Sequence, residues 1–460
     1  MISAQELIER ITTQATSDDC IVVITDKTQA NLRWANSTLT TNGVIAQRSI
    51  TIIAFVAVDG GMAAGSVSRT DLSLAEIPAA LDEAIAAAKA AGKAEDFAPL
   101  AKNVVSGAWS DPHHPTGPEV FAKVAPDLGE MFKRSVADKI ELFGYAEHTH
   151  ATTWVGSKGG IRCRYDQPVG RVEMTGKSHQ RLRSTWEGVA TKDFSNVSIP
   201  DVDKNIRQRL EWQGKKLDIP AGRYKTLLPG GSVSDLLVYM MWVSAARDAH
   251  EGRSVFSKKG GGTRIGEKIS NLPLQMFTDP AYKGLESSPF VAASASSPFS
   301  SVFDNGQSMK HVDWFKDGAL TSLVQTRASA EFTKLPYTPI GDNLIVSVDG
   351  GNGSLDELIK TIDNGLLLTT LWYIRMVDPT SLLLTGLTRD GVYQVKNGEV
   401  IGAVNNFRWN ESPVGLLSRI SKAGSTQWVQ PREWAGDVDR QAMPALIFDD
   451  FNMSTVSPAN

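Results

Sequence analysis

The sequence predicts an α+β protein, with an N-terminal domain of helices on an antiparallel sheet and a C-terminal domain that is mostly antiparallel β and barrel-like. Three observations lead to this class. The first hundred residues alternate helical and strand patterns, tight hairpin turns recur in the second half, and one nearly all-apolar helix lies between them. We place the domains at residues 1–218 and 219–460, on either side of a turn-rich bridge.

The N-terminal domain begins with an amphipathic helix, predicted over residues 3–15. A buried strand follows at Cys20–Thr25, where β-branched residues dominate. Two further strands, at 31–40 and 44–58, are expected to join at Asn42-Gly43, a dipeptide typical of two-residue hairpin turns.

An alanine-rich helix closes this first unit over residues 74–91. Pro78 suits the first turn of a helix and not its middle, so the true start is expected near Ile77. A similar order of strand, glycine turn and strand recurs further along the chain. We therefore expect an internal repeat of a small α+β unit, made of residues 1–100 and 119–212.

The C-terminal domain is expected to surround one buried helix in the stretch from Leu228 to Gly262. Ser232 and Asp235 fit a capping box, and the run from Leu236 to Ala246 is apolar almost all round. Gly252 is a suitable stop. Eleven apolar residues are too few to cross a bilayer, so a helix enclosed by protein is predicted.

Turn signals define the rest of this domain. Asp317-Gly318 and Asn397-Gly398 each lie between two strand patterns and predict hairpins. Ser354 and Glu357 predict a capped helix, and Leu366–Ile374 is expected to be one fully buried strand.

Composition argues against several functional classes. The net charge is −4 and no basic stripe is visible, so nucleic acid is a poor candidate partner. No run of 18 apolar residues and no signal peptide are found, which argues against a membrane. Cys20 and Cys163 belong to no CxxC pair and are expected to be buried thiols in a reducing, cytoplasmic compartment.

Two stretches carry a resemblance to a known family. The central stretch reads LPGGSVSDLLVYMMWVSAARDAHEGRSVFSKKGGG, and a second, beginning at Gly351, includes SLDELIK, VDPTS, TRDGVY and VKNGE. Both are similar to the TldD/PmbA family, whose members are also described as modulators of DNA gyrase. The resemblance covers residues 222–444, whereas the N-terminal half agrees in element order only.

This resemblance implies that the chain lacks the family's zinc site. Zinc-bearing, TldD-like members carry HExxxH on the central helix, with two histidine ligands and a glutamate base. The matching positions are Val238, Tyr239 and Val243, none of which is a usual zinc ligand. Those members also use a cysteine late in the chain, and here none follows Cys163. The chain thus resembles the PmbA/TldE-like type, and we expect no cofactor and no catalytic residue in it.

The resemblance further implies a cytosolic metallopeptidase complex that processes unfolded peptides, with the zinc in a TldD-like partner subunit. Polar side chains that are concentrated beside the 366–374 strand could form a groove wall that holds extended peptide by β-addition. These peptide-groove candidates are Arg375, Asp378, Thr388, Arg389 and Asp390. Alternatively, they are turn and salt-bridge residues.

Glu147-His148-Thr149-His150 is the one pattern that suggests a metal in this chain. His148 and His150 would share a face of a strand, and a self-sufficient metallohydrolase using both is an alternative function. No third ligand is identifiable, and a polar strand face is the simpler interpretation. His113 and His114, in a proline-rich loop, are expected at the surface. A non-proteolytic binding or assembly protein, such as a homodimer, is a further alternative.

Overall fold

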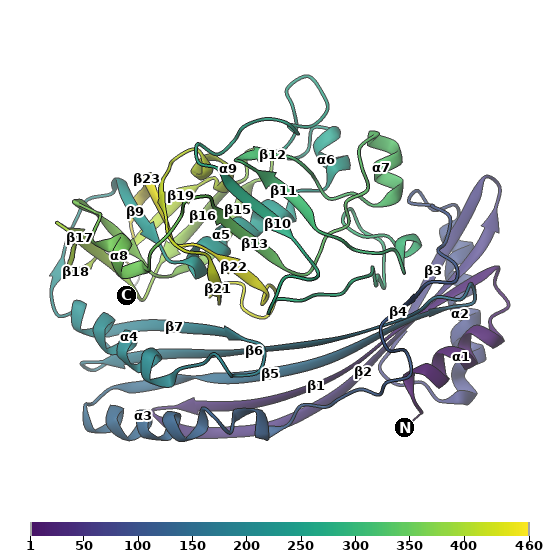
Figure 1. Ribbon diagram of the computed structural model, residues 1–460, viewed down its shortest axis with the longest axis horizontal. Helices are drawn as coiled ribbons and strands as arrows, with labels where there is room; N and C mark the ends of the chain where they lie inside the picture. The colour runs from purple at the N-terminus through teal and green to yellow at the C-terminus, as the bar shows by residue number, and fades with distance from the viewer. Residues whose placement is uncertain (1, 459–460) are drawn as a thin grey trace.

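A long, curved sheet forms the lower layer of the molecule, and most of the chain after residue 215 forms the upper layer (Figure 1). The computed structural model describes residues 2–458. The seven strands of the lower sheet lie in the order β3-β2-β1-β5-β6-β4, with β7 beside β6. They are β1 (Asp19–Ala35), β2 (Thr38–Val58), β3 (Gly61–Arg69), β4 (Val105–Ser106), β5 (Glu141–Ser157), β6 (Arg162–Ser178) and β7 (Arg183–Thr191).

Four helices cover the outer face of this sheet, away from the upper layer (Figure 1). They are α1 (Ala4–Gln14), α2 (Ile77–Ala91), α3 (Ala125–Ala137) and α4 (Ile199–Trp212), with 3₁₀ turns at Leu74–Glu76 and Pro118–Phe121. The order helix, three strands, helix therefore occurs twice, and the two sets meet where β1 pairs with β5. The predicted start of α2 at Ile77, with Pro78 in its first turn, is confirmed.

The first hairpin turn does not lie at Asn42-Gly43, as the dipeptide predicted. β1 and β2 instead turn at Asn36 and Ser37, whose φ angles are +50° and +57°. Asn42 and Gly43 continue β2 opposite Leu32 and Asn31. The turn lies there because the apolar residues Cys20–Ile24 of β1 pair with Ile50–Ala54 of β2. This pairing fixes the register of the two strands, and the register determines at which residues they turn.

Two sheets form the upper layer. The six-stranded sheet has the order β12-β11-β10-β13-β22-β21, and the ten-stranded sheet has the order β15-β16-β19-β23-β9-β14-β17-β18-β8, with β20 beside β23. Most neighbouring strands are antiparallel, which confirms the predicted fold class. The strands of the six-stranded sheet are β10 (Leu274–Thr278), β11 (Val312–Lys316), β12 (Ala319–Leu320), β13 (Leu344–Val348), β21 (Gln427–Val429) and β22 (Gln441–Met443). Those of the ten-stranded sheet are β8 (Lys216–Leu217), β9 (Gly222–Leu228), β14 (Asn364–Leu368), β15 (Leu371–Asp378), β16 (Leu383–Thr388), β17 (Val392–Lys396), β18 (Glu399–Val404), β19 (Phe407–Glu411), β20 (Ile420–Ala423) and β23 (Leu446–Val456).

The buried helix of the upper layer is α5 (Gly230–Trp242), and it shares one hydrophobic core with both sheets. The predicted single helix to Gly252 is wrong, because α5 ends at Trp242 and α6 (Ala246–His250) follows after a break. At the break, the amide of Ala246 donates to the carbonyl of Val324, and the amide of Val324 donates to the carbonyl of Ser244. Pairing with a distant segment thus replaces the helical hydrogen bonds there. Gly252, with φ +84°, follows α6 as predicted.

The capping box predicted for α5 is also wrong. The hydroxyl of Ser232 donates to the carbonyl of Thr369 at 2.9 Å, and no side chain caps the helix. The hairpins at Asp317-Gly318 and Asn397-Gly398 are confirmed, as is the capping box of Ser354 and Glu357 at α8 (Leu355–Ile359). The remaining helical elements are α7 (Arg327–Thr333), α9 (Pro413–Leu417) and a 3₁₀ turn at Val302–Asp304.

The predicted strand 366–374 is two strands. β14 ends at Leu368 beside β9 and β17, whereas β15 begins at Leu371 and lies at an edge of the ten-stranded sheet. Thr369 and Thr370 separate them and bond to the carbonyls of Gly391 and Arg389.

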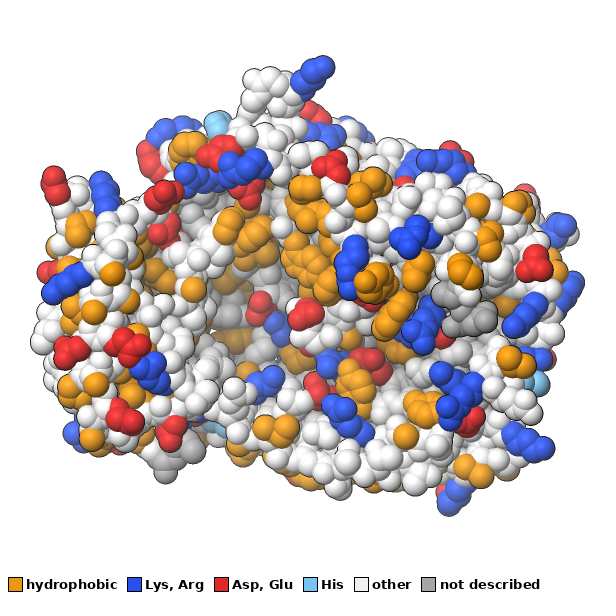
Figure 2. Space-filling view, turned by 180° about the vertical axis from the view of Figure 1, so that it is seen from behind, with side chains coloured by type: hydrophobic (Ala, Val, Ile, Leu, Met, Phe, Trp, Pro, Cys, Tyr) orange, Lys and Arg blue, Asp and Glu red, His pale blue; other side chains and the backbone are white. Residues whose placement is uncertain are grey.

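Apolar side chains join the two layers at one end. Phe55 of β2 meets Phe303 edge-on, with ring centroids 5.1 Å apart, and both are buried. The view from behind shows a hollow in the surface that is bordered in part by hydrophobic side chains (Figure 2). Cys20 and Cys163 are buried and form no disulfide, as predicted. Within residues 2–458, no helix has the length and apolar character that a membrane span requires.

Candidate functional site

The segment that joins β21 to β22 is attached to α5 by one buried carboxylate. Asp235 accepts hydrogen bonds from three consecutive backbone amides, those of Arg432 (3.1 Å), Glu433 (3.1 Å) and Trp434 (3.3 Å). Its side chain is fully buried, and this loss of solvent raises its pKa to about 8. Asp235 therefore fixes this segment on the helix, rather than capping the helix end.

Arg432 extends from this segment to the lower sheet. Its guanidinium donates to the carboxylate of Asp390 at 2.5 Å and lies over the rings of Trp372 (5.0 Å) and Trp186 (5.7 Å). Burial acts to raise the pKa of Asp390, but the charge of Arg432 outweighs it and the pKa lies below its ordinary value. Because Trp186 belongs to β7, this arginine connects the two layers.

A cavity of about 320 Å³ lies beside Arg432, between α4, β7 and the first turn of α5. We call it the α5 cavity. Its walls hold the rings of Trp186, Trp212 and Trp428, and its polar surface includes Gly230–Ser232 and Gln430. Two buried polar atoms in these walls have no hydrogen-bond partner among the described residues: the Oε1 atom of Gln430 and the Nη1 atom of Arg432. The cavity therefore combines an apolar wall of indole rings with polar residues, as small-ligand sites do.

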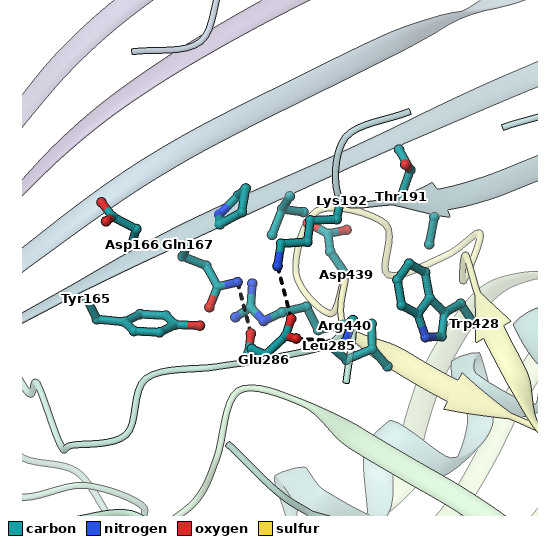
Figure 3. A pocket seen from close by; sticks show the side chains of 14 residues that line it. Tyr165, Asp166, Gln167, Thr191, Lys192, Leu285, Glu286, Trp428, Asp439 and Arg440 are labelled. Atoms are coloured by element: carbon teal, nitrogen blue, oxygen red, sulfur yellow. Dashed lines mark hydrogen bonds and ion pairs between the residues drawn. The ribbon is translucent and has the colours of Figure 1, made fainter. Parts of the chain in front are cut away.

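A second junction between the layers is smaller. Lys192 of the lower layer donates to the carboxylate of Glu286 at 3.1 Å, and Gln167 donates to the Glu286 carbonyl at 3.2 Å (Figure 3). The space that these side chains line is about 40 Å³, which is room for a few water molecules. This junction holds the layers together and offers little space for a ligand.

The positions where the resemblance places HExxxH lie on α5 and just beyond it. Val238 and Tyr239 are buried, with 2% and 5% of their surface exposed. The phenol of Tyr239 donates to the carbonyl of Ile374 at 3.1 Å, and burial raises its pKa above the ordinary range. Val243 follows the last residue of the helix. Two hydrocarbon side chains and an engaged phenol do not fit a zinc ion.

The five peptide-groove candidates have different surroundings. Asp390 is bonded to Arg432, which lines the α5 cavity, and Arg389 is stacked over Trp372 at 5.2 Å. Arg375, on the edge strand β15, lies 3.5 Å from the carboxylate of Glu433.

The other two candidates hold local structure. The hydroxyl of Thr388 is buried between Asn406 and the amide of Phe407. Asp378 accepts hydrogen bonds from Ser381 and Thr380 in an exposed turn, and these bonds lower its pKa to about 2.

His148 and His150 lie on the outer face of the lower sheet, on the side away from the α5 cavity. The ring of His148 bonds to Thr116 at 2.6 Å and to the carbonyl of Lys192 at 2.9 Å. His150 stacks near His113, with ring centroids 5.5 Å apart, and burial lowers the pKa of all three histidines. Within residues 2–458, no three His, Cys, Asp or Glu side chains gather as metal ligands would.

His113 is half-buried, in contrast to the surface position predicted for it, while His114 is exposed. The ring of His113 bonds to Thr152 at 2.8 Å and to Thr28 at 3.2 Å. These contacts hold the proline-rich loop against the sheet.

Sequence reasoning missed Trp186, Gln430 and Arg432. They come from segments more than 240 positions apart and belong to no local motif. The available signal was indirect: the Pro229-Gly230-Gly231 turn is where a backbone would be approached closely. A Cβ atom on Gly231 would indeed lie 2.6 Å from the carbonyl of Gln430.

Comparison with known proteins gives two family matches. The PmbA/TldA metallopeptidase C-terminal domain matches residues 221–455, and domain 1 of the same metallopeptidases matches residues 20–91. The second match extends the relationship into the N-terminal half, beyond the predicted range. A comparison with curated proteins finds no significant relative.

Solved structures share the fold across nearly the whole chain. TldE from Thermococcus kodakarensis has a TM-score of 0.75 and 14% identity, with 97% of this chain and 98% of that chain covered. A protein from Thermotoga maritima, described as a candidate modulator of a DNA gyrase, gives 0.76 and 15%, with 97% and 99% covered. A candidate modulator of DNA gyrase from Bacteroides thetaiotaomicron gives 0.73 and 15%, with 98% of each chain covered. With a family match over half of its length, this chain belongs to the PmbA/TldA metallopeptidase family, the TldD/PmbA family that its central and C-terminal motifs resemble.

Proposed function

We propose that this chain is the subunit without its own zinc in a two-chain, cytoplasmic metallopeptidase that processes unfolded peptides. A TldD-like partner supplies the zinc and the catalytic glutamate. This chain holds part of the peptide for that partner. An obligate pair of this kind buries on the order of 2,000 Å² or more.

One observation carries the proposal. At the position of the family's catalytic glutamate stands Tyr239, whose phenol is used in a hydrogen bond to the carbonyl of Ile374. The adjoining ligand position, Val238, has no donor atom, and the third, Val243, comes after the helix has ended. Neither valine side chain can donate an electron pair to a metal, so these positions offer neither of the motif's two histidine ligands.

The peptide-holding role is supported by the α5 cavity. Its wall of three tryptophans can cover an apolar side chain, and its polar end offers hydrogen-bonding groups to a backbone. Arg432, bonded to Asp390 within the upper layer, also lies over the ring of Trp186 in the lower layer. A rigid, partly apolar cleft of this kind suits binding without chemistry.

The proposal is tested by activity in the pair. We would purify this chain alone, the TldD-like chain alone, and both together, and measure cleavage of an unfolded peptide. The expected result is cleavage by the pair and its loss when the partner's HExxxH glutamate becomes glutamine. Cleavage by this chain alone, or an inert pair, would overturn the proposal; an inert pair would favour a binding or assembly protein.

A further inference from the structure

One edge of the lower sheet is open where the β1–β2 hairpin extends beyond β3. β3 pairs with β2 only from Ile50 onward, so within residues 2–458 no strand lies on the other side of the preceding part of β2. We call residues 38–49 the open edge. From Thr38 to Gln47, every residue except Gly43 is exposed. The main-chain groups that point away from β1 along this edge are therefore free to pair with a further strand.

The open edge lacks the prolines and unpaired charges that keep exposed sheet edges from associating. It reads TLTTNGVIAQRS, and its one charged residue, Arg48, is paired with Asp26 at 2.5 Å. Its large apolar side chains are exposed instead: Leu39 by 47%, Val44 by 49% and Ile45 by 57%. A long, uncharged and partly apolar edge of this kind favours pairing with another strand.

A second copy of this chain fits the open edge best. Two copies of the edge can meet in antiparallel about a twofold axis, which is the commonest symmetry of homodimers. The strand that the second copy offers is already held extended by its pairing with β1, whereas an unfolded peptide loses backbone freedom at each residue that it aligns. Because Arg48 is the only charged residue of the edge, like charges need not face each other across the axis.

The length of the hairpin selects the register of this pairing. The tip of each hairpin has to end where β3 of the other copy begins, beside Ile50. Pairing that is centred on Gly43 meets this condition, since Ser37 at the tip then lies opposite Ser49 of the other copy. A register centred further along β2 would drive the tip into β3, and one centred nearer the tip would leave part of the edge unpaired.

We propose that this chain forms a homodimer by antiparallel pairing of two open edges about Gly43, which joins two seven-stranded sheets into one. In this register Ile45 faces Thr41 of the other copy on one side of the sheet, and Val44 faces Asn42 on the other. The inference goes beyond the proposed function and does not depend on it. The open edge lies in the N-terminal half and includes none of the residues that line the α5 cavity.

A disulfide at the axis tests the register. Gly43→Cys places two thiols opposite each other at a Cα separation of about 4.5–5.5 Å, which a disulfide can span. A Cβ atom at Gly43 meets no other atom within 4 Å, so the variant should fold, and the native Cys20 and Cys163 are buried. On mild oxidation we expect Gly43→Cys to give a covalent dimer that a reductant reverses. Val105→Cys, at a position that is 72% exposed and outside the hairpin, should give only background cross-linking.

A charge on the open edge tests the dimer without any cross-link. In analytical ultracentrifugation we expect the wild type to change from monomer to dimer as its concentration rises. Val44→Lys should raise the dissociation constant roughly tenfold or more, because two lysines would then lie diagonally across the axis. Val136→Lys, at a valine of α3 that is 62% exposed, is the matched control and should leave the dissociation constant unchanged.

A wild type that stays monomeric at every concentration would overturn the inference, as would equal cross-linking of Gly43→Cys and Val105→Cys. A dimer that Val44→Lys leaves intact would also contradict it, because its interface would lie elsewhere. If only an added TldD-like chain or an unfolded peptide protects the thiol of Gly43→Cys from a maleimide, the edge binds that ligand and the homodimer is wrong. None of these measurements uses peptide cleavage, so the inference and the proposed function fail separately.

Discussion

Tyr239 donates a hydrogen bond from its phenol to the backbone carbonyl of Ile374, at 3.1 Å, and so joins α5 to an irregular edge strand. The strand needs this support, because Tyr373 has a left-handed φ of +53°. From the other side, the carboxylate of Glu433 accepts the amides of Tyr373 (3.1 Å) and Ile374 (3.0 Å). Tyr239 therefore has a structural role, because it helps to hold β15 against α5.

This interpretation predicts the effect of Tyr239→Phe. The substitution removes the hydrogen bond and leaves the Ile374 carbonyl without its donor, so the free energy of unfolding should fall by about 1–2 kcal/mol. Tyr373→Phe is the matched control, since that side chain is 54% exposed, and should change stability by less than about 0.5 kcal/mol. Urea unfolding of both variants gives the comparison. Equal effects would mean that the Tyr239 bond contributes nothing.

Asp235 should make stability depend on pH. Its folded pKa, about 8, lies above its ordinary value of 3.8, so folding favours the protonated form. The stability gained in this way is fully present below pH 3.8 and is lost as the pH rises through about 8. Asp235→Asn cannot titrate, so the melting temperature of the wild type should fall relative to that of the variant between pH 5 and pH 8. Parallel curves over that range would contradict a raised pKa.

The Arg432–Asp390 pair is expected to be strongly coupled. Arg432→Met removes the partner of a buried carboxylate, which should lower the free energy of unfolding by about 3–5 kcal/mol. Asp390→Asn is chosen for the other position because asparagine tolerates the left-handed backbone conformation of residue 390. In a double-mutant cycle measured by urea unfolding, the coupling free energy should be about 1–3 kcal/mol. The exposed pair Lys225–Asp449, at 3.3 Å, is the control and should give less than about 1 kcal/mol. Similar coupling in both cycles would argue against a buried pair at the layer junction.

The outer-face histidines should loosen the proline-rich loop in acid. Burial lowers the pKa of His148, so the neutral ring is the folded form, and the stability it contributes is present above pH 6.5 and lost as the pH falls through its lowered folded pKa. The bond between Thr116 and His148 should weaken on protonation. Hydrogen exchange in residues 108–116, corrected for intrinsic rates, should speed up between pH 7 and pH 5.

His148→Gln gives the contrast for that experiment, because an amide can bond to the same partners without titrating. The pH response of the loop should flatten in this variant and persist in His114→Gln, since His114 is exposed. A response that survives His148→Gln would place its origin in another group.

The sequence predicted a turn correctly where the turn residues themselves decide the backbone conformation. Asn397-Gly398 forms its hairpin because both residues adopt positive φ between two short strands. Asn42-Gly43 has the same chemistry but lies within β2, because the apolar register of a much longer strand pair decides the turn. The break after Trp242 depends on a distant residue, Val324, which no local pattern reveals.

The site was less predictable than the fold because its residues come from segments that are far apart in the sequence. Asp235 has the spacing of a capping residue, yet its partners are amides about 200 positions later in the chain. Gln430, Arg432 and Trp186 meet only because β7 and the segment after β21 cross at one junction. Of the predicted groove residues, Asp390 contacts this junction through Arg432.

The most direct test of the central claim is metal analysis of the purified chain and of its complex with a TldD-like partner. After incubation with zinc and removal of loosely bound metal, we predict no stoichiometric zinc in this chain alone and one zinc per pair. The zinc of the pair should disappear when the partner's HExxxH histidines are replaced and should persist when Tyr239 is changed to Phe. One tightly bound zinc per molecule of this chain alone would contradict the account.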